Sequence, residues 1–128
     1  MERHLERLVL VFLAGGLGAL TRYGIQGLVN DVVGRPTVLG TLVVNLSGAF
    51  ALGVLMAVTE NRLSIPPIVR TTGAIGFLGA YTTFSTLMFE SFDRVDMGDA
   101  YTAVINVVAS VVLGFIAVYS GVVLGRLL

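Results

Sequence analysis

Two long stretches without a charged residue constrain the fold of this chain more than any other feature of its sequence. Val38 to Thr59 is 22 residues long, and Ala100 to Gly125 is longer still. A helix that rises about 1.5 Å per residue crosses the roughly 30 Å hydrocarbon layer of a bilayer with about 20 residues. Both stretches are therefore predicted to span a membrane as helices.

The composition of the whole chain agrees with a membrane protein. Of its 128 residues, 55% are hydrophobic and only 12% are charged, and the mean hydropathy is +0.92. A water-soluble domain of this size does not bury so much apolar surface around one core. The formal net charge of zero gives no indication of a nucleic-acid partner, and the absence of cysteine excludes disulfides and thiolate metal sites.

Two further apolar segments complete the predicted topology. The first follows a charged N-terminal segment, and a cleaved signal peptide is the alternative there; a retained span is favoured because the run is longer than a signal-peptide core and more spans follow. The sequence thus predicts an all-α integral membrane protein with a single domain, residues 1–128, and four transmembrane helices at residues 8–29, 38–59, 71–89 and 100–125.

The third of these spans has an unusual composition. Gly73, Gly76 and Gly79 recur at three-residue spacing, and hydroxyl side chains follow them through Thr86. Glycine permits backbone conformations that a helix excludes, and non-helical backbone at membrane depth occurs only where it is buried in protein or lines a polar cavity. We therefore predict a broken third helix, interrupted around Gly79 to Thr82, whose freed carbonyls suit a hard cation such as Na⁺.

Two amides and one arginine in the other predicted spans are candidates for a functional site. Asn45 and Asn106 are mid-membrane amides, which either form interhelical hydrogen bonds or face a shared polar path. Arg22 lies late in the first span, where it either extends to the interface or attracts anions to a vestibule. Hydroxyl and amide donors, together with the positive edge of a ring such as Phe84, are able to solvate a small hard anion.

Other functions lack their residues in this sequence. No acidic residue lies deep in a predicted span, which disfavours a proton-coupled exporter with a central carboxylate. The sequence has no metal-ligand cluster, phosphate loop, cofactor motif or convincing catalytic set, so enzymatic activity has no support. A small dual-topology multidrug or cation transporter and a structural membrane subunit remain as alternatives.

The arginines favour one orientation only modestly. Five lie toward the side of the termini and three nearer the other side, and the side richer in arginine is usually cytoplasmic. If insertion is ambivalent, two copies can pair antiparallel about a two-fold axis in the membrane plane. A bundle of four helices is also too thin to shield a polar path from lipid by itself.

Three segments resemble the Fluc (CrcB-type) family of fluoride channels. They read GALTRY (residues 18–23), GTLVVNLSG (40–48) and GFLGAYTTFST (76–86), and the last is the most specific. This resemblance implies a small antiparallel, dual-topology homodimer in the plasma membrane of a bacterium or archaeon. It also implies passive export of fluoride from the cytoplasm, which relieves fluoride toxicity, and a structural Na⁺ at the dimer centre held by carbonyls that match Gly79 and Thr82.

The resemblance also implies roles for individual residues. The anion path matches Asn45, Phe84, Ser85, Thr86 and Ser110, and the vestibule arginine matches Arg22. This chain departs from the family pattern at three positions, where it has Ala80, Tyr81 and, in place of the second phenylalanine, Leu87. The roles of Thr83, Leu87 and Asn106 in the path are left open.

Overall fold

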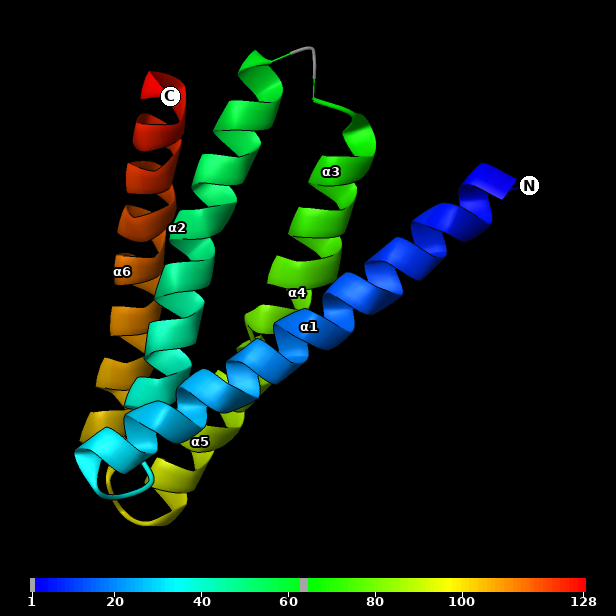
Figure 1. The fold of residues 1–128 in the computed structure, drawn as a ribbon. Helices are drawn as coiled ribbons and strands as arrows, with labels where there is room; N and C mark the ends of the chain where they lie inside the picture. Colours follow the sequence, from blue (N-terminus) through cyan, green and yellow to red (C-terminus); the bar gives the residue numbers. More distant parts are fainter. Residues whose placement is uncertain (1, 63–64) are drawn as a thin grey trace.

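The computed structural model describes residues 2–62 and 65–128, and the secondary structure of these residues is helical (Figure 1). Three long helices are α1 (Glu2–Val33), α2 (Leu39–Asn61) and α6 (Ala100–Leu127). Each of these three is long and apolar enough to cross a membrane. Between α2 and α6 lie four shorter elements: α3 (Pro67–Thr71), the π-helix η1 (Thr72–Leu78), α4 (Gly79–Tyr81) and α5 (Phe84–Asp96).

The four short elements follow one another along a single path, which corresponds to the predicted third span. In Figure 1 this path runs from the α2–α3 connection at one end of the molecule to the α5–α6 turn at the other, and the N- and C-termini lie toward the same end. An all-helical fold with about four helical passes is thus confirmed for the described residues, and three of these passes are long and apolar enough to cross a membrane. Helix α1 and the third pass extend beyond the predicted spans at both ends, and α2 and α6 extend beyond them at their C-terminal ends.

The third pass is broken as predicted, but the break lies at the end of the predicted segment Gly79 to Thr82, because Gly79 (φ −63°, ψ −34°) is still helical. Helix α4 ends at Tyr81, and Thr82 (φ −82°, ψ 157°) and Thr83 (φ −150°, ψ 117°) are extended. Gly73 and Gly76 do not take part in the break but lie in η1. A π-helix closes its hydrogen bonds over five residues instead of four, and such segments are rare and often lie at functional sites.

Glycines allow the helices to cross closely. A Cβ atom on Gly121 of α6 would overlap the Phe50 carbonyl of α2, and one on Gly18 of α1 would overlap the Phe77 carbonyl of η1. Small residues of α1 form a packing face here, since the Ala14 Cβ would also lie 2.9 Å from a Cβ atom at Gly76. In membranes such close contact replaces the hydrophobic driving force of soluble cores.

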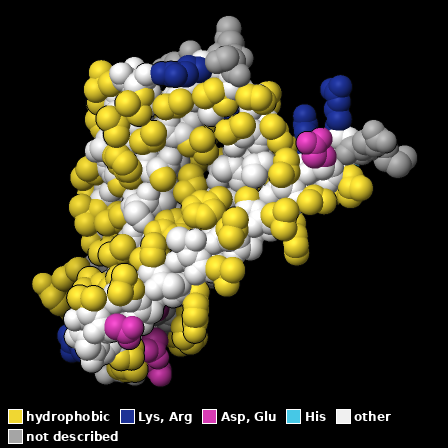
Figure 2. All heavy atoms as spheres, in the orientation of Figure 1, with side chains coloured by type: hydrophobic (Ala, Val, Ile, Leu, Met, Phe, Trp, Pro, Cys, Tyr) yellow, Lys and Arg dark blue, Asp and Glu magenta, His cyan; other side chains and the backbone are white. Residues whose placement is uncertain are grey.

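Large apolar side chains remain exposed on the outside of the bundle. Phe12 on α1 and Phe115 on α6 are 78% and 73% exposed. In Figure 2 apolar side chains cover much of the visible face, while charged side chains gather toward its ends. This distribution suits a protein surrounded by lipid, and it supports a multi-pass location in the cell membrane.

Candidate functional site

An open groove of about 400 Å³ lies beside the break in the third pass. It is formed by α2, the segment around the break, and α6. The groove brings together most of the residues that the sequence singles out for an anion path or a cation site, namely Asn45, Gly79, Thr82, Thr83, Phe84, Leu87 and Ser110. These residues come from three separate passes, so only the folded chain assembles them.

Asn45 binds the backbone of the break with both ends of its amide. The Thr83 N–H donates to Asn45 Oδ1 at 2.8 Å, and Asn45 Nδ2 donates to the Thr83 carbonyl at 3.0 Å. A backbone N–H can only donate, so its partner must be the amide oxygen, and this fixes the orientation of the amide. One N–H of Nδ2 is left over for another acceptor.

The Thr83 hydroxyl begins helix α5 and starts a run of hydroxyls. It accepts a hydrogen bond from the Thr86 N–H at 3.2 Å, as an N-cap residue does, and donates to Thr86 Oγ1 at 3.0 Å. Ser85 Oγ lies 3.4 Å from the same hydroxyl. The predicted hydroxyl residues Ser85 and Thr86 therefore meet at Thr83, whose own proton is engaged, whereas the Thr86 hydroxyl proton is available to another acceptor.

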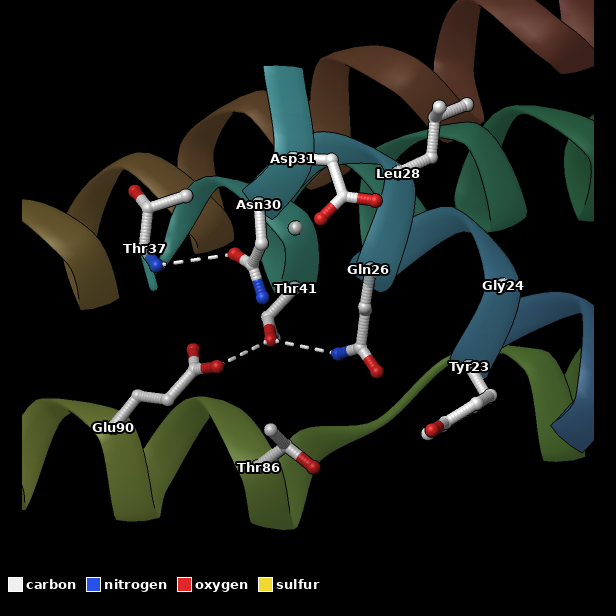
Figure 3. Close-up of a pocket in the computed structure, with 12 residues that line it drawn as sticks. Tyr23, Gly24, Gln26, Leu28, Asn30, Asp31, Thr37, Thr41, Thr86 and Glu90 are labelled. Carbon is white, nitrogen blue, oxygen red and sulfur yellow. Dashed lines mark hydrogen bonds between the residues drawn. The ribbon is translucent and has the colours of Figure 1, made fainter. Parts of the chain in front are cut away.

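A second hollow, of about 730 Å³, opens between α1, α2 and α5 (Figure 3). Thr86 and Glu90, one helical turn apart on α5, both line it. Thr41 donates to Glu90 Oε1 at 2.7 Å, and Gln26 donates to Thr41 Oγ1 at 3.0 Å. Because Thr83 lines the groove and Thr86 lines this hollow, their hydrogen bond connects the two spaces with polar atoms.

No sequence pattern had assigned Gln26, Thr41 and Glu90 to a site. A signal for two of them is present in the sequence, since Thr41 precedes Asn45 by four residues and Glu90 follows Thr86 by four residues. Side chains four apart share one face of a helix. Gln26 has no comparable signal, because its partner is set by how α1 crosses α2.

Ser110 and Phe84 differ in how they present themselves to the groove. The Ser110 hydroxyl oxygen is buried and has no hydrogen-bond partner among the described residues, and an unpaired buried hydroxyl is costly to a fold. Phe84 is 72% exposed, so its ring edge is accessible. Leu87, which the resemblance aligned with a second phenylalanine, also lines the groove and is buried.

The remaining predicted residues lie outside both spaces. Arg22 is half-buried on α1 and belongs to neither lining. Asn106 is buried between α5 and α6, where its Nδ2 donates to Ser91 Oγ at 3.0 Å. Ser91 Oγ in turn donates to the Leu87 carbonyl at 2.8 Å. This arrangement is the interhelical hydrogen bond that the sequence analysis gave as one alternative for such an amide.

The carbonyls at the break suit a hard cation. The last bond of the helical ladder before the break runs from the Thr82 N–H to the Leu78 carbonyl at 3.0 Å. Beyond it the backbone is extended, so the carbonyls of Gly79 and Thr82 do not receive their usual helical donors. Backbone carbonyls released in this way are ligands that Na⁺ accepts in membrane proteins. The donor set at these two residues therefore fits the sodium site that the resemblance implies.

Comparison with known proteins decides the family. Residues 9–122 match the family model described as CrcB-like protein, Camphor Resistance (CrcB). The chain belongs to the CrcB-like family. Two of its CrcB-like relatives, from Citrifermentans bemidjiense and Geobacter sp. (strain M21), are 42% and 43% identical over 124 residues, which is 97% of this chain and all of theirs. A third, from Solibacter usitatus, is 41% identical over 92% of this chain and 97% of its own. All three are named fluoride-specific ion channel FluC.

Proposed function

We propose that this chain is a passive, fluoride-selective channel that lets fluoride leave the cytoplasm and so relieves fluoride toxicity. The observation that carries the proposal is the groove in which Asn45, Phe84 and Ser110 meet beside the break. The names of the CrcB-like relatives, fluoride-specific ion channel FluC, support fluoride as the ion.

The groove offers uncharged hydrogen-bond donors to an anion. The second N–H of Asn45 and the hydroxyl proton of Ser110 are free to bind an anion, and the Phe84 ring presents its positive edge. Thr86 and Ser85 continue this path, which reaches the second hollow past the Thr83 hydroxyl. Short, hard donors of this kind replace the hydration of a small anion better than that of a large one. Arg22 raises the anion concentration at a vestibule of the path.

The proposal includes an antiparallel, dual-topology homodimer with a structural Na⁺ at its centre. The exposed apolar faces and the openness of the groove support a second copy, which would close the path against lipid. In this assembly the carbonyls of Gly79 and Thr82 hold Na⁺, and the ion's role is structural. No step of anion passage is assigned to it.

A flux measurement tests the channel. Purified protein is reconstituted in liposomes loaded with fluoride or with chloride, and efflux is followed with ion-selective electrodes under a potassium diffusion potential. Fluoride efflux well above that of empty liposomes, with little chloride efflux, is the expected result. Fluoride efflux that requires a proton gradient would instead favour a transporter, and no efflux would favour a structural subunit.

The variant Asn45→Asp tests the path itself. An Asp side chain has no N–H to offer an anion and adds negative charge when ionised, so we expect fluoride efflux to fall by about tenfold or more, the equivalent of one lost hydrogen bond to a charged group. Ser47→Ala, on the same helix but outside the groove lining, is the control. Efflux of Asn45→Asp at the rate of the unmodified protein would remove Asn45 from the path.

A further inference from the structure

The break leaves several carbonyls without their helical donors, and for two of them, Gly79 and Thr82, the loss originates at Thr83. In a continuous α-helix the Thr83 N–H would donate to the Gly79 carbonyl, four residues earlier. Here it donates to Asn45 Oδ1 at 2.8 Å. Likewise the Thr86 N–H would donate to the Thr82 carbonyl but is taken by Thr83 Oγ1 at 3.2 Å. Gly79 and Thr82 are the residues proposed to hold Na⁺.

The bond from Thr83 to Asn45 also sets the direction of the Thr82 carbonyl. The Thr82 C=O and the Thr83 N–H belong to the same peptide unit, and the chain has no cis peptide bond among its described residues. In a planar trans peptide the C=O and the N–H point in opposite directions. Since the N–H points at Asn45, the Thr82 oxygen points away from α2.

Helix α2 also provides the space that the break needs. A Cβ atom on Gly48 would overlap the Thr82 methyl group and would lie 3.1 Å from Tyr81 Cδ1. Three residues before Gly48, Asn45 holds Thr83 through its oxygen and its nitrogen. One face of α2 thus both admits the extended backbone and binds it.

We infer that Asn45 is the positioning residue that keeps the third pass broken: by taking the Thr83 N–H it frees the Gly79 carbonyl and aims the Thr82 carbonyl. The identity of the cation rests on the proposed function, but the hydrogen bonds between Asn45 and the Thr83 backbone do not. The amide then has two separable parts. Its oxygen holds the break, and its second N–H serves the anion path.

Two substitutions separate these parts. Asn45→Asp keeps an oxygen acceptor for the Thr83 N–H but has no N–H for an anion. Asn45→Leu has neither the oxygen acceptor nor the N–H, and leucine is similar to asparagine in volume. If the Asn45→Leu protein does not purify in a folded form, Asn45→Ala removes the acceptor with a smaller side chain. Asn106→Leu is the matched control, because it makes the same change at the other mid-membrane amide, which binds Ser91.

The first readout is hydrogen exchange at the Thr83 amide, measured by NMR on the full-length protein carrying isotope-labelled threonine. The Thr83 signal is assigned by its loss in Thr83→Ser. We expect protection in the unmodified protein, in Asn45→Asp and in Asn106→Leu, and exchange faster by about tenfold or more in Asn45→Leu, as loss of a buried hydrogen bond predicts. Equal protection in Asn45→Leu and the unmodified protein would overturn the inference.

The second readout is the sodium concentration that gives half of the full thermal stabilisation in detergent, with N-methylglucamine replacing sodium. We expect this concentration to rise by about tenfold in Asn45→Leu and to change little in Asn45→Asp, although fluoride efflux falls by about tenfold or more in both. A rise of the same size in Asn106→Leu would count against a specific role for Asn45. If sodium does not stabilise the unmodified protein, the sodium site of the proposed function fails, and exchange at Thr83 still decides the inference.

Discussion

At the scale of single residues, the hydrogen bonding of Ser110 distinguishes a ligand-binding hydroxyl from a structural one. Its hydroxyl is buried with no partner in the described part of the chain, whereas Ser120 on the same helix donates to the Ile116 carbonyl at 2.8 Å. A buried hydroxyl that stabilises a fold usually has a hydrogen-bond partner within the protein, whereas one without a partner can bind a ligand. Ser110 therefore contributes to the fold less than a serine usually does.

This contrast makes Ser110→Ala a direct test. We expect fluoride efflux to fall by about tenfold, because one donor to an anion is worth about 1.5 to 3 kcal/mol. We expect the melting temperature to stay the same or to rise, because no bond within the protein is lost. Ser120→Ala is the control and should change neither quantity appreciably. A lower melting temperature with normal efflux in Ser110→Ala would show that this hydroxyl serves the fold instead.

At the scale of secondary-structure elements, the sequence predicted the break but not what holds it. Glycines followed by hydroxyls indicated an interrupted helix, and Thr82 and Thr83 are indeed extended. The partner of Asn45 was unpredictable, because it depends on the register between α2 and the third pass. The π-helix η1 was also missed, since Gly73 and Gly76 are equally consistent with a turn and with close helix packing.

The same limit applies to the site. Asn45, Phe84 and Ser110 were expected in one path, and the structure brings them into one groove, yet their roles in conduction stay predictions. The hydrogen-bonded residues Gln26, Thr41 and Glu90 come from three helices. The four-residue spacings of Thr41 from Asn45 and of Glu90 from Thr86 were their only signal in the sequence. Contacts between helices depend on crossing geometry, which periodicity along one helix does not contain.

Two glycines of α6 provide a prediction about helix packing. Gly121→Ala places a methyl group against the Phe50 carbonyl of α2, whereas Gly114→Ala on the same helix meets nothing within 4 Å. We expect Gly121→Ala to destabilise the protein by about 1 to 3 kcal/mol through overpacking. Thermal unfolding in detergent measures the change. Gly114→Ala should unfold like the unmodified protein, and equal behaviour of the two variants would contradict this account of the α2–α6 contact.

At the scale of the whole molecule, a single copy leaves its polar groove open and its apolar faces uncovered. The groove beside the break is bordered by α2, the third pass and α6, with the exposed ring of Phe84 at its edge. A polar path in a membrane must be closed off from lipid. A second copy in the opposite orientation would supply the missing wall.

The small arginine asymmetry leads to a prediction about insertion. With five arginines toward the side of the termini and three nearer the other, we expect both orientations to form in one membrane. Cysteine placed at either terminus, in a chain that has none, should be labelled partly from each side by a membrane-impermeant maleimide. Arg35→Glu should shift the labelling toward a single orientation. Labelling of the unmodified topology from one side only would exclude the antiparallel dimer.

The glycine contacts between helices have a consequence for how this sequence can evolve. Gly73 faces the Leu55 side chain, at 2.9 Å from an added Cβ atom to Cδ2, so a larger residue there can be suppressed by a second mutation that shortens Leu55. Gly121 faces the backbone carbonyl of Phe50, and no substitution makes a carbonyl smaller. A genetic selection for fluoride resistance should therefore recover second-site suppressors for changes at Gly73 and none at Phe50 for changes at Gly121.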